Sequence, residues 1–507
     1  MLVEFRTKNF RSLRDEQVLS FVASTDKTLL DTHALGTGLK AAPHLLKSAV
    51  VYGANASGKS NLIKAMQYMR GVVLESAALQ PGQRFDQLQP FKLDSASVSQ
   101  PTEFEVTLLL NGVRYQYGFA MTAQRIVGEH LLVYKAFKPQ RWFERHVDAE
   151  SGKDIYEFGS GLKGAKNLWE GATQPNALFL SVAVQLNSDA LRPLFDWFAN
   201  GLVIFNELSP LSPQFTLQML KQETPRKAIR DFLRATDNSI ADIEVASTQT
   251  AVRSIHLDLT TGKREEEIGE QTVDEVKVHH TTDQGKAVFD LMDESSGTQN
   301  LLFLAGPILD ILKKGLTLVV DELDTSLHTL LVQALVRLFH QPDANTGGAQ
   351  LLFTTHDTSL LDAYGLFRRD QIWFVEKNPD QSSTLFPLTD FSPRKNEALE
   401  RGYLQGRYGA RQPAQGTATG AQRQKRNPPR QLCPHPDCYR GQQDRAAVFR
   451  GHPQRVSTPF SQCRRACAKD QLPYFEVITV GAETSLTITQ ARGSFGIDDR
   501  VSSRGAG

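Results

Sequence analysis

Apolar residues in the first part of the chain predict a strand followed by a helix. Residues 48–52 form a short apolar run, and residues 61–70 carry leucine, isoleucine and methionine at near-helical spacing. Strand and helix patterns also follow one another nearer the C-terminus, where residues 301–312 show helical spacing and residues 316–320 and 351–353 form apolar runs. Short apolar runs of this kind are typical of buried strands. The pattern therefore predicts an α/β domain.

A different pattern, strict alternation of apolar and polar positions, begins at Thr102. Two alternating runs flank Asn111-Gly112, a dipeptide that favours the tight turn of a hairpin. Further strands are expected over residues 129–137, 141–146 and 154–158. These runs predict an antiparallel sheet inserted into the α/β domain.

The middle of the chain predicts a helical lobe. Apolar residues recur at helical spacing from about 175 to 240, and a strand pair is expected near residues 254–259 and 275–281. No seven-residue repeat is sustained, so no long coiled coil is expected.

Composition excludes several classes of protein. The 507-residue chain carries 57 basic and 56 acidic residues, so its overall charge indicates neither nucleic-acid nor membrane binding. No apolar run has membrane-spanning length, and the first residues lack the apolar core of a signal peptide. The first 432 residues contain no cysteine, which suits a reducing compartment. We therefore expect a cytoplasmic protein with no membrane partner.

The segment Gly53–Ser60 matches the P-loop pattern G-x4-G-K-[ST], between a predicted strand and a predicted helix. In such a loop, backbone N–H groups and the helix N-terminus surround a phosphate chain. The motif predicts ATP and Mg²⁺ as ligands, with Lys59 opposing the β- and γ-phosphates and Ser60 ligating the metal. The plainer alternative is a glycine turn capped by serine. The predicted ATP-binding residues are Gly53, Ala54, Asn55, Ala56, Ser57, Gly58, Lys59, Ser60 and Asn61.

Two further apolar strands end in residues suited to phosphate chemistry. Asp321 and Glu322 follow the run 316–320 as in a Walker B motif, in which Asp321 holds Mg²⁺ and Glu322 polarises the attacking water. His356 follows the next apolar strand, where it could hydrogen-bond the γ-phosphate. A solvated acidic turn and an ordinary histidine are the plainer alternatives, which the upstream P-loop disfavours. The predicted catalytic residues are Glu322, His356 and Lys59, and the predicted metal ligands are Ser60 and Asp321.

A short polar segment precedes the helical run at residues 301–312. It predicts a capping box, in which Ser296 accepts from the helix N-terminus and Gln299 reaches back. A helix N-terminus that begins with Ser-Gly is also an anion site. The segment lies too far along the chain to be assumed to reach its own P-loop.

These motifs occur in the order found in ABC-type ATPase heads, which the chain resembles. The compact, arm-less layout is similar to the RecF, SMC and OLD branch, whose first strand and turn border the adenine. More closely, the chain resembles the bacterial AAA family ATPases with RloA-like and abortive-infection members. The stretches that carry the resemblance are Phe5–Leu13, Pro90–Asp94, Asp321–His328 and Gly406–Gly409.

The resemblance implies a homodimer or higher oligomer in which two subunits pair head to tail around two ATP molecules. One subunit would provide the P-loop, Walker B and histidine residues. The other would provide the signature in trans, formed by Ser296, Gly297, Thr298 and Gln299. Thr298 departs from the ABC signature, which has a second glycine there. No Q-loop glutamine is identifiable, with Gln87 and Gln89 as weak candidates.

The resemblance covers roughly residues 1–410 and implies a fold class and a domain organisation. The fold is an ABC-type P-loop ATPase head with a mixed sheet, an antiparallel β insertion and a helical lobe. Within the head at 1–410, the expected parts are a P-loop part at 1–75, an antiparallel β subdomain at 100–160, a helical and β insertion at 175–290, and the signature, Walker B and switch-histidine part at 291–410.

Residues 411–507 differ in composition from the rest of the chain. They contain 13 Arg against 2 Lys, all four cysteines, and little apolar periodicity before residues 474–489. We expect a disordered tail or an aberrant one produced by a frame change in the coding sequence. A basic arm that contacts nucleic acid is an alternative, and so is a zinc site formed by Cys433, Cys438, Cys463 and Cys467.

Three functions are open on the sequence alone. The first is an ATP-hydrolysing switch in anti-phage defence that acts through a separate effector nuclease. The second is a RecF-like repair or recombination ATPase that binds DNA directly, and the third is a nucleotide-dependent scaffold with slow turnover. No Glu…Asp-x-Asp constellation typical of a nuclease domain follows residue 410, so we expect nuclease activity from a partner.

Overall fold

The computed structural model describes residues 1–40, 42–135, 138–206, 213–234, 239–258, 264–391, 397–408 and 485–491. It divides into two compact units. The first contains the described residues of Met1–Glu244 and Val278–Asn427, and the second contains those of Val245–Lys277 and Pro428–Gly507, which include β19 (Ser485–Ala491). The four cysteines lie outside the described residues, as does most of the tail, so the predictions made for them stay predictions.

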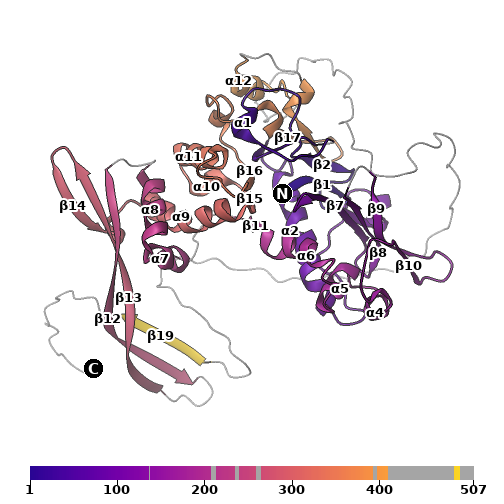
Figure 1. Ribbon diagram of the computed structural model, residues 1–507, viewed down its shortest axis with the longest axis horizontal. Coiled ribbons are helices and arrows are strands. Elements are labelled where there is room, and N and C mark those ends of the chain that lie inside the picture. Colours follow the sequence, from indigo (N-terminus) through magenta and orange to yellow (C-terminus); the bar gives the residue numbers. More distant parts are fainter. Residues whose placement is uncertain are drawn as a thin grey trace, which may run out of the picture. The chain divides into compact units, whose positions relative to one another are not determined.

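A six-stranded sheet carries the P-loop (Figure 1). Its order is β11-β15-β16-β5-β17-β18, and all neighbouring strands are parallel except the antiparallel pair β17 and β18. Parallel strands end at one edge of a sheet, so the residues that follow β5, β15, β16 and β17 meet there. The strands are β5 (Ser48–Gly53), β11 (Leu202–Phe205), β15 (Thr317–Val320), β16 (Gln350–Thr354), β17 (Ile372–Lys377) and β18 (Ser383–Pro387).

Strands β5, β15 and β16 are buried along their whole length, which explains their nearly unbroken apolar sequences. Helix α2 (Lys59–Glu75) begins directly after the P-loop. The other helices of this α/β part are α1 (Leu30–His33), α9 (Ser296–Lys314), α10 (Leu323–Ser326), α11 (Thr329–His340) and α12 (Leu399–Leu404), with 3₁₀ turns η4 (Thr358–Leu361), η5 (Arg369–Gln371) and η6 (Leu388–Phe391).

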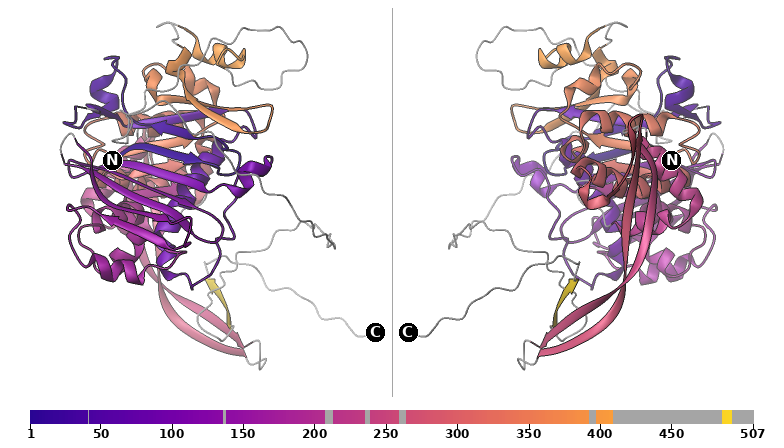
Figure 2. Two further views of the ribbon diagram at one scale, coloured as in Figure 1. Left: turned by 90° about the vertical axis from the view of Figure 1, so that its right-hand side faces the viewer. Right: turned by 90° about the vertical axis from the view of Figure 1, so that its left-hand side faces the viewer.

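A seven-stranded antiparallel sheet follows in the order β10-β9-β8-β7-β6-β1-β2, with its strands side by side in Figure 2. Asn111 and Gly112 have φ of 50° and 76°, so the predicted hairpin turn is confirmed. The sheet also recruits the first two strands of the chain, because β1 pairs with β6. The strands are β1 (Leu2–Lys8), β2 (Gln17–Ser20), β6 (Thr102–Leu110), β7 (Val113–Met121), β8 (Ile126–Tyr134), β9 (Gln140–Val147) and β10 (Asp154–Phe158).

Helix α2 joins the two sheets into one core. Its residues Ile63 and Met66 belong to the same buried apolar cluster as Val51 of β5 and Val106 of β6. Tyr68 of the helix also contacts the Phe104 ring, with 5.8 Å between ring centroids. The helix that begins at the P-loop is therefore packed between the two sheets.

The predicted helices are present, and they lie in two groups (Figure 1). Thr216 of α7 donates through its hydroxyl to the carbonyl oxygen of Phe303 (2.9 Å). Pro307 has no N–H for that carbonyl, so Thr216 replaces the missing helical hydrogen bond and lets α9 continue through proline. One group packs beside α2 and contains α4 (Lys166–Ala172), α5 (Phe179–Gln185), α6 (Arg192–Asp196) and the π-turn η2 (Trp197–Gly201). The other packs against α9 and contains α7 (Gln214–Leu220) and α8 (Glu223–Arg234).

The predicted strand pair exists and is longer than expected. Strands β12 (Ile240–Asp258) and β13 (Arg264–Thr282) have 19 residues each, and β14 (Gly285–Asp290) follows as an edge strand. Strand β19 (Ser485–Ala491) pairs antiparallel with β12. The remaining short elements are β3 (Ala34–Gly36), β4 (His44–Leu46), α3 (Ser95–Ser99), η1 (Ser76–Ala78) and η3 (Leu291–Asp293).

We expected no long coiled coil and no membrane-spanning segment, and both expectations can be compared with the described part of the chain. Its longest helices are α9 with 19 residues and α2 with 17, so this part contains no coiled-coil arm. None of its helices combines the length and apolarity needed to cross a bilayer.

One local prediction is wrong. The N-cap of α9 is Ser295, whose hydroxyl oxygen accepts from the N–H of Thr298 (3.1 Å), and not Ser296. Gln299 does reach back, but its side-chain amide donates to the carbonyl oxygen of Glu294 (2.9 Å). The helix therefore begins at Ser296, because Ser295 has the extended backbone (ψ 147°) that an N-cap needs.

Candidate functional site

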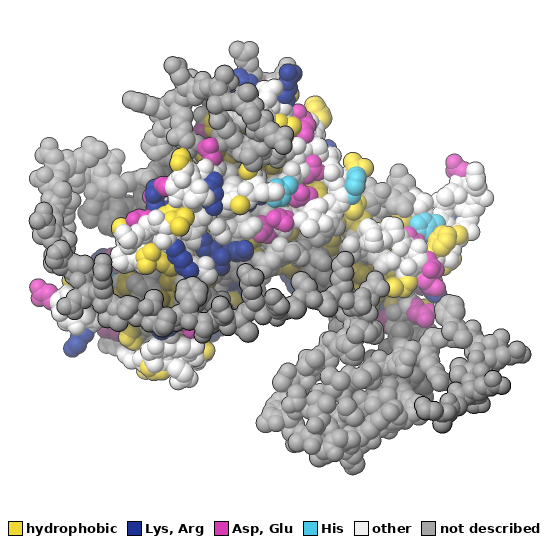
Figure 3. Space-filling model, turned by 180° about the vertical axis from the view of Figure 1, so that it is seen from behind, with side chains coloured by type: hydrophobic (Ala, Val, Ile, Leu, Met, Phe, Trp, Pro, Cys, Tyr) yellow, Lys and Arg dark blue, Asp and Glu magenta, His cyan; other side chains and the backbone are white. Residues whose placement is uncertain are grey.

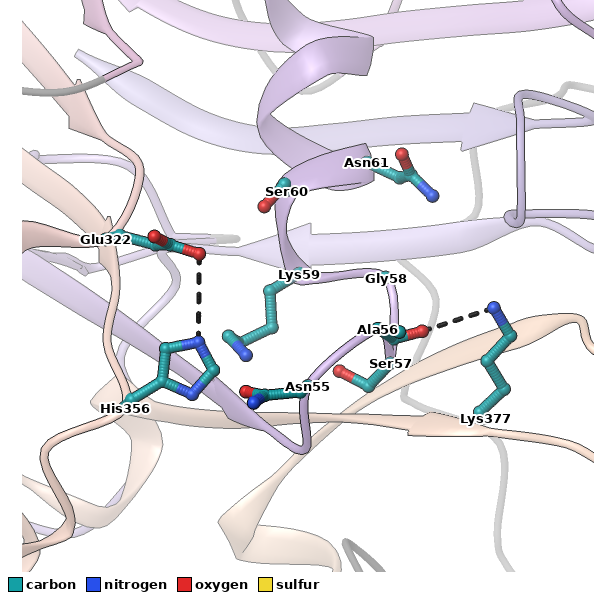
Figure 4. A pocket seen from close by; sticks show the side chains of 10 residues that line it. All are labelled: Asn55, Ala56, Ser57, Gly58, Lys59, Ser60, Asn61, Glu322, His356 and Lys377. Atoms are coloured by element: carbon teal, nitrogen blue, oxygen red, sulfur yellow. Dashed lines mark hydrogen bonds and ion pairs between the residues drawn. The ribbon is translucent and has the colours of Figure 1, made fainter. Parts of the chain in front are cut away.

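One pocket of about 780 Å³ brings Glu322 and His356 together with seven of the nine predicted ATP-binding residues (Figure 4). Gly53, Ala54 and Asp321 do not line it. Its lining comes from the P-loop, the start of α2 and the ends of three further strands of the six-stranded sheet. The lining residues are Asn55, Ala56, Ser57, Gly58, Lys59, Ser60, Asn61, Glu322, His356 and Lys377. Segments about 320 residues apart in the sequence thus form one site.

The P-loop backbone is shaped by two residues in left-handed conformation, Ala56 with φ 60° and Gly58 with φ 110°. A side chain at position 58 would also collide with the hydroxyls of Ser12 and Ser383, so glycine is required there on two grounds. Ala56 adopts its conformation against the usual preference of a residue with a Cβ.

A chain of hydroxyl groups supports the loop from behind. The amide of Asn61 donates to Ser12 Oγ (2.7 Å), which lies 2.8 Å from Ser383 Oγ. Ser383 in turn donates to the carbonyl oxygen of Ser57 (2.5 Å). These contacts tie the turn after β1 and the start of β18 to the P-loop. Sequence reasoning missed Ser12 and Ser383, because no local motif marks either of them.

Lys59 is only 5% exposed, and its Nζ donates to the carbonyl oxygen of Gly53 (2.8 Å). Burial lowers the pKa of this ammonium group to about 8, although the nearby carboxylates of Glu322, Asp321 and Asp324 oppose the shift. A cation in this position supplies the charge that a phosphate chain in the loop requires.

Thr354 on the neighbouring strand holds both Asp321 and Glu322, the first through its carboxylate and the second through its backbone. Thr354, the last residue of β16, donates its hydroxyl to Asp321 Oδ1 (2.6 Å) and accepts from the backbone N–H of Glu322 (2.7 Å). Asp321 is 8% exposed, whereas Glu322 faces the pocket. Sequence reasoning missed Thr354, although it ends an apolar strand that lies next to the strand preceding Asp321 and Glu322.

His356 lies beside Glu322 at one end of the pocket (Figure 4). Its Nε2 is 3.8 Å from Glu322 Oε1, and its backbone N–H donates to the carboxylate of Asp324 (3.1 Å). The structure therefore fixes the backbone of the histidine through Asp324 and leaves the ring facing the predicted base.

The donor chemistry fits a Mg²⁺ ion that takes most of its ligands from phosphate and water. Ser60 and Asp321 offer a hydroxyl and a carboxylate oxygen, the hard donors that Mg²⁺ prefers. No group of three or more His, Cys, Asp or Glu side chains suited to a metal occurs in the described ranges. The described part of the chain therefore contains no metal site formed entirely by such side chains.

The signature segment does not join this pocket within one chain. Ser296, Gly297, Thr298 and Gln299 form the N-terminus of α9 and are not among the residues that line the pocket. Gln87 and Gln89, the weak Q-loop candidates, do not line it either. Lys377 does line it and was missed, although it ends a strand of the parallel sheet, where ligand-binding residues gather.

Comparisons with known proteins agree with the motifs. The AAA_21 family model, described as "AAA domain, putative AbiEii toxin, Type IV TA system", matches residues 48–362. No curated protein matches the chain.

Among solved structures, the SMC head domain from Thermotoga maritima is similar at 13% identity, over 76% of this chain and 98% of that chain, with a TM-score of 0.37. The SmcHead bound to the C-winged helix domain of ScpA shows 15% identity over 76% of this chain and 97% of that chain, with a TM-score of 0.36. The Smc head domain with an extended coiled coil from Pyrococcus furiosus shows 12% identity over 81% of this chain and 99% of that chain, with a TM-score of 0.35.

Proposed function

The chain belongs to the AAA_21 family of AAA domains, and on that basis we propose that it is an ATP-hydrolysing switch. One observation carries the proposal. A single pocket gathers a P-loop lysine, Ser60, a carboxylate and a histidine from the ends of three neighbouring strands. A phosphate-binding loop alone would support nucleotide binding, but the carboxylate facing it supports hydrolysis as well.

Each side chain has a role that its position suggests. The P-loop N–H groups and Lys59 hold the β- and γ-phosphates, and Glu322 accepts a proton from the water that attacks the γ-phosphate. His356 contacts the γ-phosphate and so senses its presence. Mg²⁺, when held by Ser60 and Asp321, neutralises part of the phosphate charge. Thr354 holds the Asp321 carboxylate and the Glu322 backbone in place through its two hydrogen bonds.

The switch is proposed to assemble as a head-to-tail pair around two ATP molecules. The N-terminus of α9 carries the signature residues, yet it does not line the pocket of its own chain. A second copy can bring its α9 to this pocket, where the helix N-terminus would face the γ-phosphate. Assembly would then depend on ATP, and hydrolysis would release it.

We place the switch in defence against phage, with a separate nuclease as effector. The support is the family description, which names a type IV toxin–antitoxin system. Direct DNA binding is the competing outcome, and the interspersed basic and acidic side chains on the face shown in Figure 3 do not favour it. Stimulation of ATP hydrolysis by duplex DNA alone would favour it.

The purified protein tests the proposal directly. We expect it to bind ATP, to hydrolyse it with Mg²⁺ and to form larger assemblies only when ATP is present. Lys59→Ala should weaken ATP binding on the order of 100-fold, because it removes a charge-assisted contact to the phosphates. Equilibrium titration with a fluorescent ATP analogue measures this loss, and an unchanged affinity would mean that the loop is purely structural.

The pKa of Lys59 predicts a pH dependence of ATP affinity. Because this pKa is about 8 in the free protein and phosphate contact raises it, binding takes up a proton above pH 8. Affinity should be constant below about pH 7 and should fall about tenfold between pH 7 and pH 9.

Lys59→Arg is the control for this pH dependence, because arginine stays charged throughout the range. Titrations from pH 6.5 to 9.5 should show a flat profile for this variant. The same slope in both proteins would assign the pH dependence to another group.

A further inference from the structure

Lys377 is a second lysine of the pocket, and the proposed hydrolysis does not use it. It is the last residue of β17, it is exposed, and its Nζ donates to the carbonyl oxygen of Ala56 (3.2 Å). Figure 4 shows it on the opposite side of the P-loop from Glu322 and His356. The pocket therefore has a hydrolytic end and a second, cationic end.

The backbone that carries Lys377 is fixed on both sides. Strand β17 pairs with the P-loop strand β5, so that Val375 lies opposite Gly53. The turn that follows is held to the N-terminal part of the chain by the ion pair between Arg14 and Asp380 (2.7 Å). Lys377 is therefore placed by the sheet and the turn, and not by chance contact of a mobile loop with the pocket.

The position of the hydrolytic end determines how a bound nucleotide is oriented in the pocket. The γ-phosphate must lie near Glu322 and His356 for hydrolysis, so the nucleoside leaves the loop at the other end, lined by Asn61 and Lys377. The N–H groups of a P-loop point toward the phosphates, whereas the carbonyl oxygen of Ala56 accepts a hydrogen bond from Lys377. The Nζ of Lys377 thus contacts the P-loop on the side away from Lys59 and Glu322 (Figure 4).

We propose that Lys377 binds the nucleoside half of the nucleotide. Its methylene stem covers one face of the ribose or base, as long lysine stems cover apolar surfaces, while its Nζ donates to a ribose or base acceptor. This assignment rests on the proposed function, because it takes its direction from the position of the γ-phosphate.

The test separates nucleoside contacts from phosphate contacts. Binding of ATP, ADP and inorganic tripolyphosphate is measured for the full-length wild type, Lys377→Met and Lys377→Arg. Lys377→Met should weaken ATP and ADP binding by the same factor, about tenfold, because one charged hydrogen-bond donor is lost. It should leave tripolyphosphate binding unchanged, and Lys377→Arg should keep most of the ATP affinity. Lys64→Met is the matched control, since Lys64 is exposed on α2 and does not line the pocket.

An equal loss for tripolyphosphate would overturn the proposal, because it would mean that Lys377 acts on the phosphates or on the shape of the P-loop. Unchanged ATP affinity in Lys377→Met would overturn it too. Both results leave the proposed function standing, as long as the wild type binds ATP. A wild type that binds tripolyphosphate but not ATP would overturn the nucleoside site, and one that binds neither would overturn the proposed function itself.

Discussion

Glu322→Gln should bind ATP as well as the wild type does and should lose turnover by about 100- to 10,000-fold, the range for loss of a general base. The amide has nearly the same shape as the carboxylate, but it is a much weaker proton acceptor. Lys59 and the P-loop are untouched, so the phosphates are still held. ATP-dependent assemblies should therefore persist much longer than in the wild type. Phosphate release and size-exclusion chromatography with ATP measure the two effects.

Glu75→Gln is the matched control for this variant, because Glu75 is exposed at the end of α2 and lies outside the pocket lining. It should hydrolyse ATP at the wild-type rate. If Glu322→Gln retained hydrolysis within a few-fold of the wild type, another group would have to be the base. His356 would be the first to examine, since its ring lies 3.8 Å from Glu322.

The hydrolytic end of the pocket was predictable because its residues follow local patterns. Lys59 belongs to a contiguous motif, and Glu322 and His356 each follow an apolar strand. Parallel strands of one sheet present their carboxyl ends at the same edge, so three strand ends were expected to meet. The hairpin at Asn111-Gly112 was predictable for a similar reason, since this turn depends on two adjacent residues.

The supporting residues were not predictable, because their adjacency is tertiary. Ser12 and Ser383 are 371 positions apart and meet only where the turn after β1 and the start of β18 pack against the P-loop. Lys377 reaches the pocket because β17 pairs with β5, a choice of neighbour that the sequence of β17 does not encode. The cap of α9 was misplaced by one residue because Ser296 and Gln299 match the spacing of a capping box, whereas the backbone conformation makes Ser295 the cap.

The length of the strand pair β12 and β13 was underestimated for a physical reason. Much of β13 is charged, with Glu265, Glu266 and Glu267 in succession, so the alternation that marks a half-buried strand is missing there. Pairing between the two strands continues without that alternation. Apolar periodicity marks strands with one buried face, and it gives no signal where a strand continues through successive charged residues.

Ser296→Arg should leave ATP binding close to normal and abolish assembly-dependent hydrolysis. The side chain at position 296 is exposed at the N-terminus of α9, away from the pocket of its own chain. In a head-to-tail pair, the added arginine would obstruct the partner's ATP instead. ATP titration and phosphate release from the single variant test the two halves of this expectation.

Mixing Ser296→Arg with Lys59→Ala gives the sharper test. In a mixed pair, one composite site combines an intact Lys59 with an intact Ser296, and the other carries both defects. Random pairing of equal amounts should therefore restore about a quarter of the wild-type hydrolysis, because half of the pairs are mixed and half of their sites are intact. Each variant alone should show only slight ATP hydrolysis. If mixed pairs form but hydrolysis stays absent at every ratio, α9 does not complete the site of a partner. Catalysis would then have to be explained within one chain.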